Sequence, residues 1–226
     1  MQKLYSMDIH EPIWRCCVLP GKLLLGVVGD DRNKLFAWDI KACFRQPVTE
    51  LVDSLRLQHA VTALLPLEFT QHRFFCVGYG TGEMAVFDSH NMDIAEEVQF
   101  LQDPLDILIE CTENQKLRSC IVGASYDSST IRLVSFRVNQ EQFVDIGMIK
   151  LRSHVTSIVE LGDLNLAVSQ QNGEVELWNL KQTEAPHRIL ETYDLMVNSL
   201  ISIEQCSFLI GMTKDARIIV WKVSNG

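Results

Sequence analysis

The segment Glu174-Val175-Glu176-Leu177-Trp178-Asn179 decides the fold, because four other segments of the chain repeat its pattern. Each is a short apolar run that ends at or next to an aromatic residue. The other four segments lie at residues 34–39, 83–88, 131–136 and 217–222. Their aromatic residues follow one another at intervals of about 42 to 49 residues, which is typical of stacked supersecondary units. The sequence therefore predicts five copies of one structural unit.

Each unit divides into β-like runs that are separated by turns. In the fourth unit, apolar runs at 155–161 and 164–169 are followed by Gln171-Asn172-Gly173 and then by the aromatic run. Gly, Asp and Asn supply the backbone conformations of such turns. The second run of each unit is almost wholly apolar, as expected for a strand that is covered on both faces. A weaker outer run completes the unit, so the pattern predicts an all-β protein.

The outer run of the first unit is the least certain element of this pattern. We expect it near residues 43–51. A short helix or turn at 48–57 is the alternative, because this is the best helical periodicity in the chain.

The two ends of the chain predict how the repeat closes. The fifth unit stops after its third run, while residues 3–9 precede the first unit without an earlier partner. If they pair beside 217–223, the five units form a closed ring without exposed edges. Residues 1–226 would then be one domain. The alternative is a larger ring whose other units are missing, irregular or supplied by another chain.

The repeat resembles the WD-repeat β-propeller family. Trp38-Asp39, Trp178-Asn179 and Trp221-Lys222 stand where the family has its Trp-Asp pair, and Phe87-Asp88 is a variant of it. His10, His59 and His154 stand where the family has the histidine of its Gly-His pair, and residues 125–133 are close to its turn-plus-strand consensus. No unit carries the family's complete Asp–His–Ser/Thr–Trp set. The resemblance implies a β-propeller of about five four-stranded blades.

Composition and charge exclude several classes of partner and compartment. The formal charge is −9 and the pI is about 5.1. An acidic surface repels phosphate backbones, so we expect no nucleic-acid binding. The sequence has no apolar run of membrane-spanning length and no signal-peptide pattern, so we expect no membrane association. The seven cysteines form no CxxC pair, which favours free thiols in the cytoplasm or nucleus.

No group of residues has the pattern of a catalytic or metal site. Asp30-Asp31 and Glu96-Glu97 read as turn and surface residues, and the six histidines show no short ligand spacing. Cys16 and Cys17 are adjacent, so they cannot both face inward on one strand. We therefore expect no cofactor, no metal and no enzymatic activity. A propeller enzyme, such as a hydrolase or lyase, would require polar residues that converge at the central channel.

The function that this pattern favours is a non-catalytic scaffold that binds protein partners, because rigid blades hold loops at fixed positions. The segments that enter the first runs and the turns between second and third runs share one face. The candidate partner-binding residues on it are Glu11, Trp14, Asp31, Arg32, Tyr79, Glu83, Asp106, Tyr126, Asp127 and Lys214. The acidic character favours a basic peptide or a surface rich in Lys and Arg. The alternative is an adaptor subunit, or an incomplete propeller, within a larger enzyme complex such as a ubiquitin ligase or methyltransferase. Either function makes the chain a subunit of a multiprotein complex.

Overall fold

The computed structural model describes residues 11–19, 23–39, 51–71, 73–113, 118–192, 195–203 and 207–223. Within these ranges the strands form five antiparallel sheets, and each sheet is built from strands that are consecutive in the sequence. No helix in this described part of the chain is long and apolar enough to cross a membrane. The prediction of an all-β protein with five repeating units is confirmed.

The strands of each sheet are hydrogen-bonded in sequence order. The first sheet contains β1 (Ile13–Leu19), β2 (Leu23–Val28), β3 (Lys34–Asp39) and β4 (Leu51–Arg56). The second contains β5 (Val61–Pro66), β6 (Phe74–Tyr79), β7 (Glu83–Asp88) and β8 (Ile94–Gln99). The third contains β9 (Ile107–Glu113), β10 (Arg118–Ala124), β11 (Thr130–Arg137) and β12 (Gln142–Lys150). The fourth contains β13 (Val155–Gly162), β14 (Asn165–Gln170), β15 (Val175–Asn179) and β16 (Arg188–Leu190). The fifth contains β17 (Val197–Ile203), β18 (Phe208–Thr213) and β19 (Ile218–Lys222).

In the first and fifth sheets, the aromatic residue of the repeat packs across a glycine of the second strand of its own sheet. The Trp38 ring lies against Gly26, where a Cβ atom would come within 2.7 Å of the ring. The Trp221 ring lies against Gly211 in the same way, at 2.8 Å. The absence of a side chain on the second strand therefore gives the indole its place.

The turn between the second and third strands requires glycine in the second sheet. Gly82 has a φ of 82°, and a Cβ atom there would lie 2.4 Å from the Leu101 carbonyl oxygen. Glycine adopts this left-handed conformation without steric cost and leaves room for the neighbouring backbone. The turn thus brings Glu83 back into the sheet beside Tyr79.

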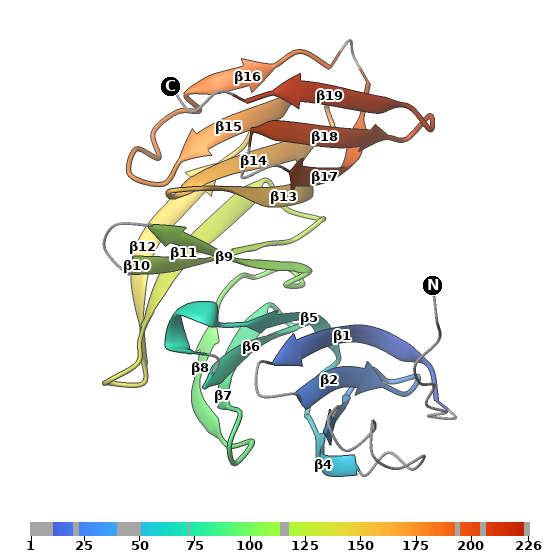
Figure 1. Ribbon diagram of the computed structural model, residues 1–226, viewed down its shortest axis with the longest axis vertical. Coiled ribbons are helices and arrows are strands. Elements are labelled where there is room, and N and C mark those ends of the chain that lie inside the picture. Colours follow the sequence, from blue (N-terminus) through green and yellow to red (C-terminus); the bar gives the residue numbers. More distant parts are fainter. Residues whose placement is uncertain are drawn as a thin grey trace.

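The five sheets follow one another around an arc, with the first strand of each on its inner side (Figure 1). Neighbouring sheets contact each other through these first strands, from β1 to β5, β9, β13 and β17 in turn. Apolar layers fill the space between sheets. The second and third sheets share Phe74, Phe100, Ile121 and Phe136, and the Phe74 and Phe136 rings meet edge to face with centroids 5.3 Å apart.

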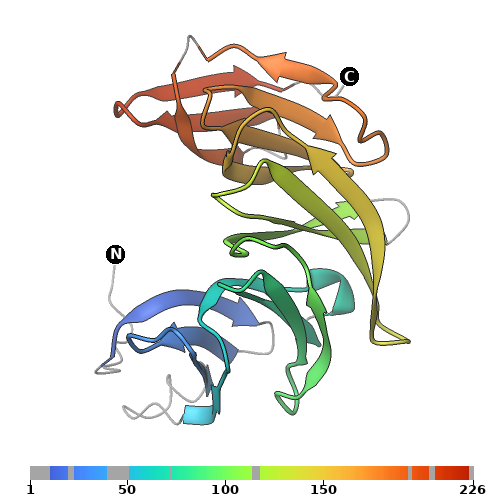
Figure 2. The same ribbon diagram turned by 180° about the vertical axis from the view of Figure 1, so that it is seen from behind.

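The first and fifth sheets lie at the two ends of the arc, which is open on one side (Figures 1 and 2). Residues 3–9, which we expected to complete the fifth sheet, lie outside the described residues. Ring closure by that segment therefore remains a prediction, and so does the single domain over 1–226.

The outer strand of the first sheet differs from its expected position. It runs from Leu51 to Arg56 and not near 43–51, and residues 40–50 lie outside the described part. Leu35 pairs with Leu55, so this register continues the apolar face that β3 presents to the second sheet. The alternative of a helix at 48–57 is wrong for residues 51–56. A short 3₁₀ helix, η1 (Glu68–Thr70), was not expected from the sequence.

Candidate protein-binding face

The antiparallel pairing places the predicted loops at the same end of every sheet. The start of the first strand pairs with the end of the second strand, as Val61 does with Tyr79 and Val197 does with Thr213. The segment that enters the first strand is therefore next to the turn that follows the second strand. We call this end of the sheets the loop face. It carries all ten residues that the sequence singled out.

On the first sheet, four side chains form one cluster of the loop face. The Trp14 indole Nε1 donates a hydrogen bond to the Gly29 carbonyl oxygen at 2.9 Å. The Arg32 guanidinium lies over the Trp14 ring, 3.8 Å from its centroid. Lys34 Nζ forms an ion pair with Glu11 Oε2 at 2.8 Å. Trp14 nevertheless stays 42% exposed, so the stacked Trp–Arg pair presents an apolar surface to solvent.

The inner strands of four sheets surround an opening on the same face. It encloses about 350 Å³, and Arg15, Asp106, Tyr126 and Ser157 are among the residues that line it. Asp106 Oδ2 accepts a hydrogen bond from the Tyr126 backbone N–H at 3.1 Å. The Arg15 Nε donates to the Thr62 carbonyl oxygen at 3.1 Å. The Tyr126 side chain is 43% exposed, so its ring is available beside a polar opening.

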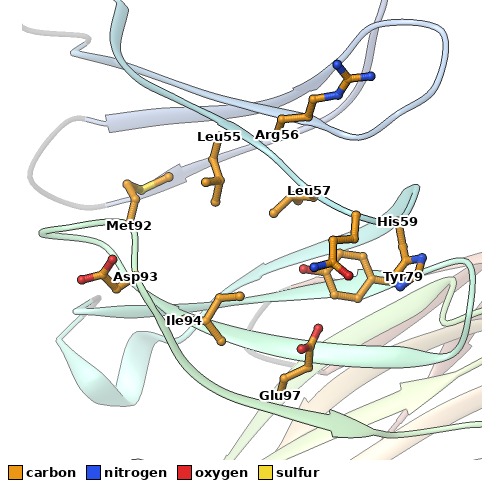
Figure 3. A pocket seen from close by; sticks show the side chains of 10 residues that line it. Leu55, Arg56, Leu57, His59, Tyr79, Met92, Asp93, Ile94 and Glu97 are labelled. Carbon is orange, nitrogen blue, oxygen red and sulfur yellow. The ribbon is translucent and has the colours of Figure 1, made fainter.

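Tyr79 lies in a different place from the one expected for a contact residue. Its side chain is only 3% exposed and lines a pocket of about 340 Å³ between the first two sheets. Figure 3 shows Tyr79 in this pocket with Leu57, His59 and Glu97. Burial raises the pKa of the Tyr79 phenol, and the charges of Glu97 and Glu83 raise it further. The phenol is therefore neutral at physiological pH.

Glu83 and His59 lie beside this pocket. His59 Nε2 is 3.5 Å from Glu83 Oε2, and the His59 ring meets the Tyr79 ring edge to face at 6.0 Å. The second sheet thus brings Tyr79 and Glu83 together. It also adds His59, which sequence reasoning had assigned only to the structural histidine of the repeat.

The three remaining candidates lie apart from these clusters in exposed turns. Asp127 follows Ser125, whose Oγ accepts a hydrogen bond from the Asp127 backbone N–H at 3.1 Å. Lys214 is held by its backbone N–H, which donates to the Met196 carbonyl oxygen at 3.0 Å. Asp31 belongs to the β2–β3 turn. The side chains of all three point to solvent, so they are free to meet a partner.

Sequence reasoning missed Arg15, which lines the opening from β1. Its place could have been read from the alternation of a strand, since Arg15 lies two residues before Cys17 and therefore shares the face that packs against the second sheet. The expected alternation of Cys16 and Cys17 is confirmed. Burial raises the pKa of the Cys17 thiol to about 12, with Cys16 adding to the shift. The Cys17 thiol is therefore protonated and a poor nucleophile at neutral pH.

The described residues contain no group of three or more His, Cys, Asp or Glu side chains that could hold a metal ion. Asp30 and Asp31 are both exposed in the β2–β3 turn. What the loop face offers is therefore an array of exposed aromatic and charged side chains around a polar opening.

Comparison with known proteins bears on the fold. No protein-family model matches the chain, and no curated protein matches it in sequence. Among solved structures, the β-propeller domain of Cps50 (Swd1) from Myceliophteria thermophila is similar, with a TM-score of 0.77 at 14% sequence identity. The similarity covers 96% of this chain and 73% of that one. Sequence identity this low bears on fold alone. Together with the five consecutive antiparallel sheets, this similarity shows that the chain has a β-propeller fold.

Proposed function

We propose that this chain is a non-catalytic scaffold of the WD-repeat type that binds a protein partner through its loop face. The observation that supports the proposal best is the Trp14–Arg32 stack, which is held by a backbone hydrogen bond and still exposed. Tyr, Trp and Arg dominate the energetics of protein interfaces. A pre-ordered aromatic pair also loses little side-chain freedom on binding.

The charges of the loop face favour a partner that carries Lys or Arg. Asp30, Asp31 and Asp127 are exposed, and no ion pair satisfies them among the described residues. Glu11, in contrast, is already paired with Lys34. The net charge of −9 adds attraction at longer range for a basic partner. We expect the complex to form in the cytoplasm or nucleus.

Affinity purification of the tagged protein from the cells that express it tests this function. We expect a protein partner to copurify with the wild type, and its yield to fall at least about tenfold for Arg32→Ala or Tyr126→Ala, as for interface residues that dominate binding. Ile146→Ala is the matched control, because Ile146 is 49% exposed on the outer strand β12. If both loop variants retained the partners of the wild type, loop-face binding would be wrong.

A second measurement addresses the charge of the partner. The double variant Asp31→Asn, Asp127→Asn removes two exposed carboxylates without changing the size of the side chains. We expect it to slow association with the copurified partner, with the largest difference at low salt. Equal association rates at low salt would refute a basic partner while leaving loop-face binding intact.

A further inference from the structure

The pocket between the first two sheets has the size and lining of a binding site. Its volume is about 340 Å³, which is at the lower end of the range for pockets that hold ligands. Its walls come from β4 and the segment that follows it, from the end of β6, and from β8 with the turn that precedes it. The pocket lies between the sheets and is separate from the opening that Arg15, Asp106 and Tyr126 line.

The walls of this pocket are largely apolar. Leu57 and Met92 are buried and belong to the apolar layer between the two sheets, and Leu55 packs against that layer. Ile94, on the outer strand β8, is 51% exposed at the rim. Figure 3 shows Leu55, Leu57 and Ile94 pointing into the space between the two sheets. Walls of this kind gain free energy when they cover a hydrocarbon chain.

The Tyr79 hydroxyl is a polar group in this pocket that has no protein partner. The Tyr79 side chain is only 3% exposed, and its hydroxyl forms no hydrogen bond within the part of the chain that the structure describes. Figure 3 shows the hydroxyl end of the ring directed into the pocket. A buried polar group that stays unpaired costs free energy, so an occupant of the pocket that pairs with this hydroxyl is favoured.

Carboxylates give the polar end of the pocket its charge. Glu97 forms no ion pair among the described residues, and its carboxylate points from β8 toward Tyr79 and His59 (Figure 3). The charges of Glu97 and Glu83 both raise the pKa of the Tyr79 phenol, so both act on this end of the pocket. The Arg56 guanidinium points away from the pocket (Figure 3). The polar end is therefore negative and attracts a cation.

We infer that this pocket binds a lysine side chain of a protein partner. The methylene stem of the lysine packs along Leu57, Met92 and Ile94. Its ammonium group pairs with the Glu97 carboxylate and donates a hydrogen bond to the Tyr79 hydroxyl oxygen. Arginine fits less well, because its five N–H donors need more acceptors than these two groups supply. The inference rests on the proposed function, since it names the side chain by which the partner is recognised.

Methionine NMR of the purified protein tests the inference, with N-acetyl-lysine methylamide as the probe. Isotope labelling of the methionine methyl groups makes Met92 a reporter inside the pocket and Met148, 55% exposed on β12, a reporter outside it. We expect the lysine probe to shift the Met92 signal saturably and to leave the Met148 signal in place. The Kd should be about 1 mM, as for a ligand of this size. The norleucine counterpart of the probe lacks the ammonium group and should bind at least about tenfold more weakly.

Two substitutions assign the contacts of the ammonium group. Glu97→Gln removes the charge and Tyr79→Phe removes the hydroxyl, so we expect each to weaken binding of the lysine probe at least about fivefold. Both variants should melt close to the wild type, because Glu97 is exposed and the Tyr79 hydroxyl has no protein partner among the described residues. Glu184→Gln, at an exposed carboxylate outside the pocket, is the matched control. An unchanged Met92 signal, equal binding of the norleucine probe, or tighter binding of the arginine counterpart would each overturn the inference.

The copurified partner separates this inference from the proposed function. Glu97→Gln should lower the yield of the partner at least about tenfold, as Arg32→Ala should. If Arg32→Ala lost the partner and Glu97→Gln kept it, the lysine pocket would be wrong while loop-face binding stood. If Glu97→Gln lost the partner and both Arg32→Ala and Tyr126→Ala kept it, the lysine pocket would stand while binding through the wider loop face failed.

Discussion

Two carboxylates on inner strands hold the backbone of the preceding sheet. Glu160 Oε1, on β13, accepts hydrogen bonds from the Thr112 backbone N–H at 2.7 Å and from the Thr112 hydroxyl at 3.4 Å. Glu110, on β9, accepts from the Glu68 N–H at 2.6 Å. Burial raises the pKa of both carboxyl groups, although these hydrogen bonds act in the opposite direction. Ionisation of the two groups therefore opposes folding.

The variant Glu160→Gln tests whether ionisation of the Glu160 carboxyl group opposes folding. A carboxyl group whose pKa is raised by folding contributes stability below that pKa, and this contribution is lost as pH rises through it. The amide oxygen of glutamine can still accept from Thr112, and the buried charge is gone. We expect the free energy of unfolding of the variant to fall less than that of the wild type between about pH 4 and pH 7. Urea unfolding across this range measures it, with Glu184→Gln as the exposed control. Parallel profiles for Glu160→Gln and the wild type would contradict the assignment.

At the residue scale, the sequence predicted positions better than contacts. The aromatic repeat correctly located Trp178 and Trp221, but their hydrogen-bond partners were not foreseen. Trp178 Nε1 donates to Glu176 Oε2 at 2.9 Å, and Trp221 Nε1 donates to the Glu191 carbonyl oxygen at 2.9 Å. The Trp178 bond lies within β15, whereas the Trp221 bond depends on a residue 30 positions earlier, which one segment read alone does not contain. The burial of Tyr79 was missed for the same reason, because β8 and residues 57–59 cover it.

At the scale of elements, the order of strands followed from local signals. Apolar runs separated by Gly, Asp and Asn turns mark second and third strands clearly, because such strands are buried on both faces. Outer strands are half-exposed and carry a weaker pattern, as the pattern of β8 with its exposed and half-buried residues shows. The position that the sequence predicted for β4 was wrong for that reason. The short strand β16 spans only three residues and gives little periodicity.

A matched pair of substitutions tests how sheets cover each other. Val175→Ala removes a buried side chain from the layer between the fourth and fifth sheets, and we expect it to cost about 1–3 kcal/mol of unfolding free energy. Val220→Ala makes the same chemical change on β19, where Val220 is 57% exposed and we expect a cost of about 0.5 kcal/mol or less. Urea unfolding of the purified chain compares the two variants. Equal losses would mean that Val220 is buried in solution.

At the scale of the whole molecule, the repeat predicted stacked sheets but not the size of the ring. Each unit specifies its own strands and two apolar faces, so the sequence counts only the units that it contains. The repeat alone does not determine whether the first and fifth sheets pack on each other or on further sheets. The structure adds the exposures of Ile218 and Val220, which distinguish a bare face from a covered one.

The central claim is that the five described sheets follow one another around an arc whose last sheet exposes an apolar face, and hydroxyl-radical labelling of the purified chain tests it most directly. Met212 is 45% exposed on the fifth sheet and Met84 is fully buried in the second, so the two methionines compare an exposed and a covered sheet face within one molecule. Oxidation of methionine follows exposure. An open arc predicts that Met212, Ile218 and Val220 are modified rapidly while Met84 and Val175 stay protected. Protection of Met212 and Val220 equal to that of Met84 and Val175 would mean that this face of the fifth sheet is covered in solution, and would contradict the account.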